Sequence, residues 1–302
     1  MAKKAAKRIA TGLGALSAAG LLGAVLTYRK VGRGKHDIVI ENNCRPAYEK
    51  VTATYKASMW SFTSFDGLKL KAYYYQPQEP SHKYAILVHG YHGCYTDMMP
   101  FAEHYLEKGY NCLMPMLRGH GLSAGDYAGF GYYDHYDIMG YIDLIREKDE
   151  QAQIILHGCS MGAATVMMDA GEFLPRNVKA IIEDCGYTSA WDQLAYNLRT
   201  MYHLPPFPLL NLLDLSFRAH DQFSLKDASH IKAIAHSTVP VLFVHSDADD
   251  FVPFVMMDQL YDACTSEKDR LVIPGARHCM SITTDPKMYW EKADSFLNNY
   301  IQ

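Results

Sequence analysis

The chain has 302 residues, of which 49% are hydrophobic, so it can bury a sizeable core. Its 29 lysines and arginines are outnumbered by 33 aspartates and glutamates, and no basic stripe follows the N-terminus, which excludes the electrostatic pattern of a nucleic-acid-binding protein. The seven cysteines are scattered, odd in number and without a C-x-x-C pair. They predict mostly free thiols rather than a zinc site or a complete disulfide framework.

The first predicted element is an uncharged run of twenty residues, 9–28, that follows a basic stretch. As a helix at about 1.5 Å per residue it would reach roughly 30 Å, the thickness of a bilayer core. We therefore expect residues 1–30 to form a retained single-pass membrane anchor, with the N-terminus inside and the following domain outside the cytoplasm. A cleaved signal peptide and a soluble helix are the alternatives.

Residues 31–50 are predicted to be a linker, and two runs rich in aromatic and β-branched residues follow it, 51–63 and 68–76. Asp66 and Gly67 between these runs predict a β-hairpin. From residue 84 onward, short apolar strands alternate with helical stretches, which is typical of a mostly parallel sheet covered by helices on both faces. The strands are predicted at 84–88, 111–116, 153–157, 178–183, 239–245 and 270–273, and the helices at 97–108, 134–149, 160–174, 254–264 and 286–300.

One connection in this pattern is unusually long, since about fifty residues separate the strand that ends near Cys185 from the one that begins at Val239. A structureless loop of that length is uncommon in a compact domain. Helical stretches at 189–201 and 209–219 flank a segment of prolines and large apolar residues. We expect residues 187–238 to form an inserted helical lid, and a peripheral pair of helices is the alternative.

The pentapeptide Gly158-Cys159-Ser160-Met161-Gly162 lies between a predicted strand and a predicted helix. It matches the G-x-S-x-G nucleophile elbow, in which a serine on a strained turn exposes its hydroxyl. Any side chain at Gly158 or Gly162 is expected to collide with the neighbouring strand or helix. Ser160 is therefore predicted to be a nucleophile, with a surface serine on a tight turn as the alternative. Cys159 is expected to pack in the core.

A serine nucleophile needs a base to take its proton and a carboxylate to orient that base. Among the fourteen histidines, His278 is the best placed, because it follows the last predicted strand at the same sheet edge as Ser160. The segment after the preceding strand offers three carboxylates, of which one is needed: Asp247, Asp249 and Asp250.

An oxyanion hole requires two backbone N–H groups that point at the developing negative charge. We expect Met161, directly after the serine, to supply one, and Tyr91, in the loop after the strand at 84–88, to supply the other. Three residues of that region could be mistaken for metal ligands, but they lie on one loop without a carboxylate partner pattern: His89, His92 and Cys94. No metal and no organic cofactor is expected.

Four motifs make the chain similar to serine hydrolases of the α/β-hydrolase superfamily, in the bacterial branch of monoglyceride-lipase-like esterases, cinnamoyl and feruloyl esterases and serine-aminopeptidase-like members. They are His89-Gly90-Tyr91, residues 118–123, residues 158–162, and residues 245–253 paired with His278. The resemblance covers residues 51–302 and implies an α/β-hydrolase fold, in which the order Ser, Asp, His along the chain is the usual one.

The resemblance also selects one carboxylate. In the family's H-G-x-x-D-x-x-V-P pattern the acid is the fifth residue, which corresponds to Asp249, although Ser246 stands here where glycine is usual. The other acid position of the family corresponds to Asp184. The segment that begins at Asp184 and the following Leu-Pro-Pro-Phe-Pro resemble bacterial hydrolases with an N-terminal membrane segment, which supports the anchor.

These residues predict a hydrolase that cleaves a small to medium, neutral, moderately apolar ester through an acyl-enzyme intermediate. A small-molecule ester is the expected partner, and no nucleic acid is expected. One alternative is a serine aminopeptidase-like amide hydrolase, in which Asp214, Asp221 or Glu183 would hold the free amine of the substrate. The other is a non-catalytic, membrane-tethered binding protein.

Overall fold

The computed structural model describes residue 23, residues 26–29 and residues 31–302. In this part of the chain, one eight-stranded sheet has the order β1-β2-β4-β3-β5-β6-β7-β8. The strands are β1 (Ala57–Thr63), β2 (Lys69–Tyr75), β3 (Lys83–Val88), β4 (Asn111–Met116), β5 (Gln153–Cys159), β6 (Val178–Asp184), β7 (Val241–Ser246) and β8 (Lys268–Ile273). β2 is antiparallel to β1 and β4, and the pairs from β4 to β8 are parallel. The predicted α/β-hydrolase architecture is confirmed.

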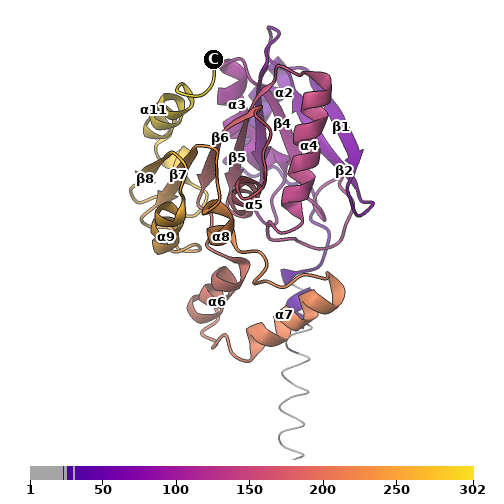
Figure 1. Ribbon diagram of the computed structural model, residues 1–302, viewed down its shortest axis with the longest axis vertical. Helices are drawn as coiled ribbons and strands as arrows, with labels where there is room; N and C mark the ends of the chain where they lie inside the picture. The colour runs from indigo at the N-terminus through magenta and orange to yellow at the C-terminus, as the bar shows by residue number, and fades with distance from the viewer. Residues whose placement is uncertain (1–22, 24–25, 30) are drawn as a thin grey trace, which may run out of the picture.

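Most helices lie in the connections between the strands and pack on the sheet, whereas α2 precedes β1 and α10 and α11 follow β8 (Figure 1). They are α2 (Arg45–Thr54), η1 (Tyr95–Met98), α3 (Met99–Glu107), α4 (Asp134–Lys148), α5 (Met161–Ala170), α6 (Ala190–Thr200), α7 (Leu209–His220), α8 (His230–Ile234), α9 (Val255–Ala263), α10 (Ser281–Thr284) and α11 (Pro286–Leu297).

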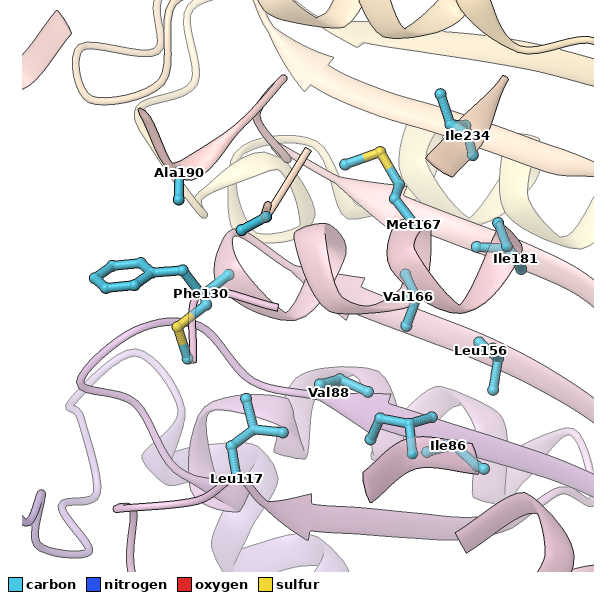
Figure 2. Close-up of a cluster of buried hydrophobic side chains, with 14 of the residues drawn as sticks. Ile86, Val88, Leu117, Phe130, Leu156, Val166, Met167, Ile181, Ala190 and Ile234 are labelled. Atoms are coloured by element: carbon cyan, nitrogen blue, oxygen red, sulfur yellow. The ribbon is translucent and has the colours of Figure 1, made fainter. Parts of the chain in front are cut away.

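Alternating side chains of the central strands build two cores, one on each face of the sheet. Ile86 and Val88 of β3 belong to the core that contains α4 and α5, whereas Leu87 between them belongs to the core that contains α3 and α11. Figure 2 shows Val88 and Leu156, from neighbouring strands, close to Val166 of α5. Strands that are buried on both faces have the continuous apolar runs from which they were predicted.

The predicted hairpin is confirmed, because β1 pairs with β2 in antiparallel register. Its first run was nevertheless predicted to begin at Val51, which is wrong. Residues Arg45–Thr54 form α2, whose first turn holds a proline, and Ala47 and Val51 are buried on the same face. Residues four apart share one face of a helix, so burial of this pair against α3 outweighs the strand preference of the local sequence. α2 also takes up the end of the predicted linker.

The long connection after β6 contains three helices, α6, α7 and α8. α6 and α7 lie beyond the layers of the sheet, at the end of the molecule opposite the C-terminus (Figure 1). They occur where helical stretches were predicted, whereas the five-residue α8 was not foreseen. Leu210, Leu213 and Phe217 of α7 are buried in the larger core, so α7 is fixed to the domain by its apolar face.

The predicted single-pass anchor is contradicted, because no helix among the described residues is both long enough and apolar enough to span a bilayer. Residues 9–22, 24 and 25 of the predicted span lie outside the described part. At the end of the span, Tyr28 is 4% exposed, and its ring meets that of Phe217 edge-on at 5.0 Å between centroids. Its hydroxyl donates a hydrogen bond to Asp221 at 2.7 Å. This end of the span therefore packs on α7.

The hydrophobic signal of the span was misleading because nine of its twenty residues are glycine or alanine, which contribute little apolar surface per residue. The expectation that the domain lies outside the cytoplasm depended on the anchor, and it is withdrawn with it.

Candidate active site

The turn between β5 and α5 holds Ser160 in a strained conformation, with φ +56° and ψ −115°. Its N–H donates a hydrogen bond to the carbonyl of Asp184 at the end of β6, at 2.8 Å. A Cβ atom at Gly158 would lie 2.1 Å from the carbonyl oxygen of Gly162, and one at Gly162 would lie 1.9 Å from that of Val88. The expectation that both positions accept only glycine is confirmed. The surrounding backbone thus maintains a turn that costs about 1–3 kcal/mol in isolation.

A chain of hydrogen bonds leads from this serine to a carboxylate. The Nε2 atom of His278 lies 2.8 Å from Ser160 Oγ, and its Nδ1 atom lies 2.7 Å from Asp249 Oδ2. The other carboxylate oxygen accepts hydrogen bonds from the N–H groups of Phe251 at 2.9 Å and Val252 at 2.8 Å. The three side chains follow β5, β7 and β8 at the carboxyl edge of the parallel sheet, where ligands bind in folds of this kind.

The other carboxylates considered from the sequence have different partners. Asp247 accepts a hydrogen bond from a backbone N–H at 2.7 Å, and Asp250 forms an exposed ion pair. Asp184 is buried and accepts a hydrogen bond from a tyrosine hydroxyl at 3.0 Å. Of these four carboxylates, Asp249 is the one that contacts His278.

A second histidine contacts the same carboxylate and was not assigned a role from the sequence. The Nε2 atom of the fully buried His245 lies 3.4 Å from Asp249 Oδ2 and 3.1 Å from the carbonyl oxygen of Val252. Burial raises the pKa of Asp249, but its hydrogen bonds with His245 and His278 lower the pKa by more than burial raises it. The net shift places the pKa below its usual range. The carboxylate is therefore ionised at neutral pH.

The environment of His278 shifts its pKa upward. Burial lowers the pKa, whereas the Cys185 sulfur and the Asp249 carboxylate raise it and more than offset the burial. Burial also raises the pKa of the Cys185 thiol, which is neutral at neutral pH. We therefore attribute the upward shift of the pKa of His278 to the charge of Asp249.

This shift predicts the pH dependence of any reaction in which His278 takes the proton of Ser160. The ring must be neutral to accept a proton, so activity is lost as the pH falls through its pKa. The acid limb of a kcat/KM profile should lie above about 6.5, the ordinary pKa of histidine. A profile with a limb at or below that value would contradict the upward shift.

Two backbone N–H groups lie beside Ser160. Met161 begins α5, so its N–H has no partner within the helix, and Tyr91 follows Gly90, where an added Cβ would lie 3.3 Å from the Cβ of Ser160. Neither N–H donates a hydrogen bond to another described residue. The Tyr91 hydroxyl donates to the carbonyl oxygen of Val31 at 2.6 Å, which ties this loop to the N-terminal segment.

Two cavities reach Ser160. The first measures about 310 Å³, and its walls include His278, Cys279, Met280, Glu41 and Asp97. The second measures about 160 Å³ and is lined mainly by apolar side chains, among them Phe130, Tyr187, Ala190, Leu194 and Val31. A third cavity of about 290 Å³ adjoins the second, since Val31, Leu194, Asn197 and Tyr202 border both, and it extends to α7. The contribution of Val31 was not foreseen, because nothing in the linker sequence marks it.

In the loop after β3, His89 has a hydrogen-bonding role. Its Nε2 atom accepts a hydrogen bond from the N–H of Leu117 at 3.1 Å. Among the described residues, three cysteines form a group with metal-compatible spacing, and their convergence was not foreseen: Cys159, Cys185 and Cys279. The seven cysteines are all free thiols, as predicted, and Cys159 is buried in the core.

Comparison with known proteins agrees with the fold. The family model described as alpha/beta hydrolase fold matches residues 86–204. The chain is 30% identical over 234 residues to the uncharacterized protein YqkD of Bacillus subtilis (strain 168), a match that covers 77% of this chain and 76% of that protein. It is 25% identical over 241 residues to the thermostable monoacylglycerol lipase of Bacillus sp. (strain H-257), covering 70% and 88%.

A solved structure shows the same fold. The esterase Pf2001 of Pyrococcus furiosus superposes with a TM-score of 0.70 at 18% sequence identity, over 90% of this chain and 100% of that chain.

Proposed function

Because the chain belongs to the alpha/beta hydrolase family, we propose that it is a serine hydrolase that cleaves carboxylic esters through an acyl-enzyme intermediate. The observation that carries this proposal is the continuous hydrogen-bonded chain from Ser160 through His278 to Asp249. These hydrogen bonds also argue against the alternative of a non-catalytic binding protein. The similarity to a monoacylglycerol lipase supports the choice of an ester as substrate.

The reaction proceeds in two steps. Ser160 Oγ attacks the acyl carbonyl while its proton passes to His278 Nε2, and the charge on the carbonyl oxygen is stabilised by the N–H groups of Tyr91 and Met161. His278 then protonates the leaving alcohol, which departs. A water molecule gives its proton to His278 and attacks the acyl-enzyme, and the acid is released as the proton returns to Ser160. Asp249 holds the imidazole in the required tautomer throughout.

The two cavities at Ser160 suit the two halves of an ester. His278 delivers a proton to the leaving oxygen, so the leaving group faces the cavity that His278 lines. The acyl group then occupies the second, apolar cavity, whose continuation toward α7 accommodates a longer chain. Residues 187–238 act as the lid in this arrangement, because Ala190 and Leu194 of α6 form part of the acyl wall.

The aminopeptidase alternative requires a free carboxylate near the amine of the acyl group. Asp214 accepts hydrogen bonds from Arg218 at 2.9 Å and from a serine hydroxyl at 2.7 Å, and Asp221 accepts one from Tyr28. Burial raises the pKa of Glu183 to about 8, which keeps it neutral at neutral pH. None of the three lines a cavity that reaches Ser160.

The first cavity does contain carboxylates, Glu41 and Asp97. They lie on the leaving-group side of the reaction, whereas the free amine of an aminopeptidase substrate belongs to the acyl side. The arrangement therefore favours an ester.

The test compares p-nitrophenyl butyrate with the p-nitroanilide of an amino acid that has a free amine. We expect kcat/KM to be higher for the ester. Faster hydrolysis of the anilide would contradict the ester assignment and favour the aminopeptidase alternative.

The position of Leu194 predicts a change in acyl specificity. A tryptophan at this position would fill the passage between the second and third cavities. Leu194→Trp is therefore expected to lower kcat/KM for p-nitrophenyl octanoate by about tenfold or more, while the acetate ester is affected much less. Val255→Trp, at an exposed position of α9, is the matched control. An equal loss for both esters would contradict the assignment of the acyl side.

A further inference from the structure

Three thiols lie close together beside Ser160 and His278. Cys159 ends β5, Cys185 follows β6, and Cys279 follows His278 in the loop after β8. The Cys185 sulfur lies 3.9 Å from that of Cys159 and 3.6 Å from that of Cys279, and all three sulfurs lie within 4.8 Å of one another. The thiol cluster, as we call these three residues, therefore joins the elements that carry the nucleophile and the base.

The spacing of the sulfurs matches the edges of a metal site. Thiolate sulfurs bind Zn²⁺ at about 2.3 Å, and two sulfurs on one tetrahedral ion are then about 3.8 Å apart. The observed separations of 3.6 and 3.9 Å lie on either side of this value. A disulfide, by contrast, would require a sulfur separation of about 2.05 Å, so a pair of sulfurs would have to approach by about 1.5 Å or more.

A path into the thiol cluster exists. Cys159 and Cys279 line the first cavity, together with Ser160 and His278, so a small cation can reach the sulfurs from the substrate side. Binding of the ion to the three thiols releases their protons to solvent.

We propose that the thiol cluster binds one thiophilic d¹⁰ cation, of the class of Zn²⁺, and that the bound ion inhibits the enzyme. Cys185 is the link to the reaction, because its sulfur also lies within 4.8 Å of the nearest ligand atoms of Asp249 and His278. Three thiolates leave the fourth tetrahedral position of the ion open, and coordination of Asp249 or His278 at that position withdraws this side chain from its hydrogen bonds in the active site. The inhibition rests on the proposed function, whereas the binding does not.

Binding is tested on the reduced, full-length protein with Cd²⁺, a d¹⁰ ion that gives an ultraviolet charge-transfer band with thiolates, and by native mass spectrometry. We expect one Cd²⁺ per chain, displaced by Zn²⁺. Cys185→Ser and Cys279→Ser should each lose the band, and Cys264→Ala, which removes a buried thiol elsewhere, should keep it. Ser160→Ala should also keep it, so a failure of the proposed function leaves this result interpretable.

Inhibition is tested by adding one equivalent of Zn²⁺ during ester hydrolysis. The expected result is a loss of about tenfold or more in kcat that a chelator reverses, and resistance to the same Zn²⁺ in Cys185→Ser. A protein that gives no band, or a band unchanged in both serine variants, would overturn the site. Stoichiometric binding with undiminished hydrolysis would overturn the link through Cys185 to His278.

Discussion

Replacing Ser160 by alanine is expected to lower kcat for p-nitrophenyl butyrate by about 10⁶-fold, the scale seen when a hydrolase loses its serine nucleophile. The hydroxyl is the group that contacts His278 Nε2, and alanine provides no atom that can form the acyl-enzyme. The fold should persist, because the turn is set by Gly158, Gly162 and the backbone around them. Circular dichroism and thermal unfolding check this point.

Ser295→Ala, at an exposed position of α11, is the control for the substitution itself and should retain full turnover. A Ser160→Ala protein that keeps more than about a tenth of the original rate would show that another group attacks the ester.

Asp249→Asn is expected to lower kcat by about 10⁴-fold, because an amide in place of the carboxylate holds the imidazole in the wrong tautomer. Without the negative charge, the pKa of His278 should also fall, which moves the acid limb of the kcat/KM profile to lower pH. A purely structural effect of the substitution would not move this limb. Both quantities come from one set of rate measurements across pH.

Asp247→Asn is the matched control, since it makes the same chemical change two residues away, and the asparagine Oδ1 can still accept the hydrogen bond that Asp247 accepts from the N–H of Gly275. It should leave both kcat and the acid limb nearly unchanged. The opposite ranking of the two variants would assign the orienting role to Asp247.

The sheet could be predicted from the sequence because its central strands are buried on both faces. Such strands appear as short apolar runs, and the turn after β5 carries two glycines that close backbone approaches require. The positions of Ser160 and His278 followed from the same argument, since each comes soon after a strand of one parallel sheet. That argument left three carboxylates open, and the family resemblance selected Asp249 among them.

The N-terminal region was predicted less well. The predicted anchor depended on the absence of charge in residues 9–28, which does not distinguish a membrane span from a segment that ends against the domain. The contacts of Tyr28 with Phe217 and Asp221 join residues about 190 positions apart, and no local sequence pattern predicts them. α2 was missed for a related reason, because its burial depends on a neighbouring helix.

The thiol cluster could be predicted from the sequence only in part. Cys159 is adjacent to Ser160 and Cys279 is adjacent to His278, so their approach follows once the serine and histidine are brought together. Cys185 joins them because β6 pairs with β5 and ends at the same level. The sequence alone could suggest the first pair, but the third member depends on strand order.

The most direct test of the proposed function is the reaction of the intact protein with a fluorophosphonate, which modifies an activated serine covalently, followed by peptide mass spectrometry. We expect one adduct per chain, on the peptide that contains Ser160. A folded protein that remains unlabelled, or that carries the adduct on a different residue, would contradict the proposed function.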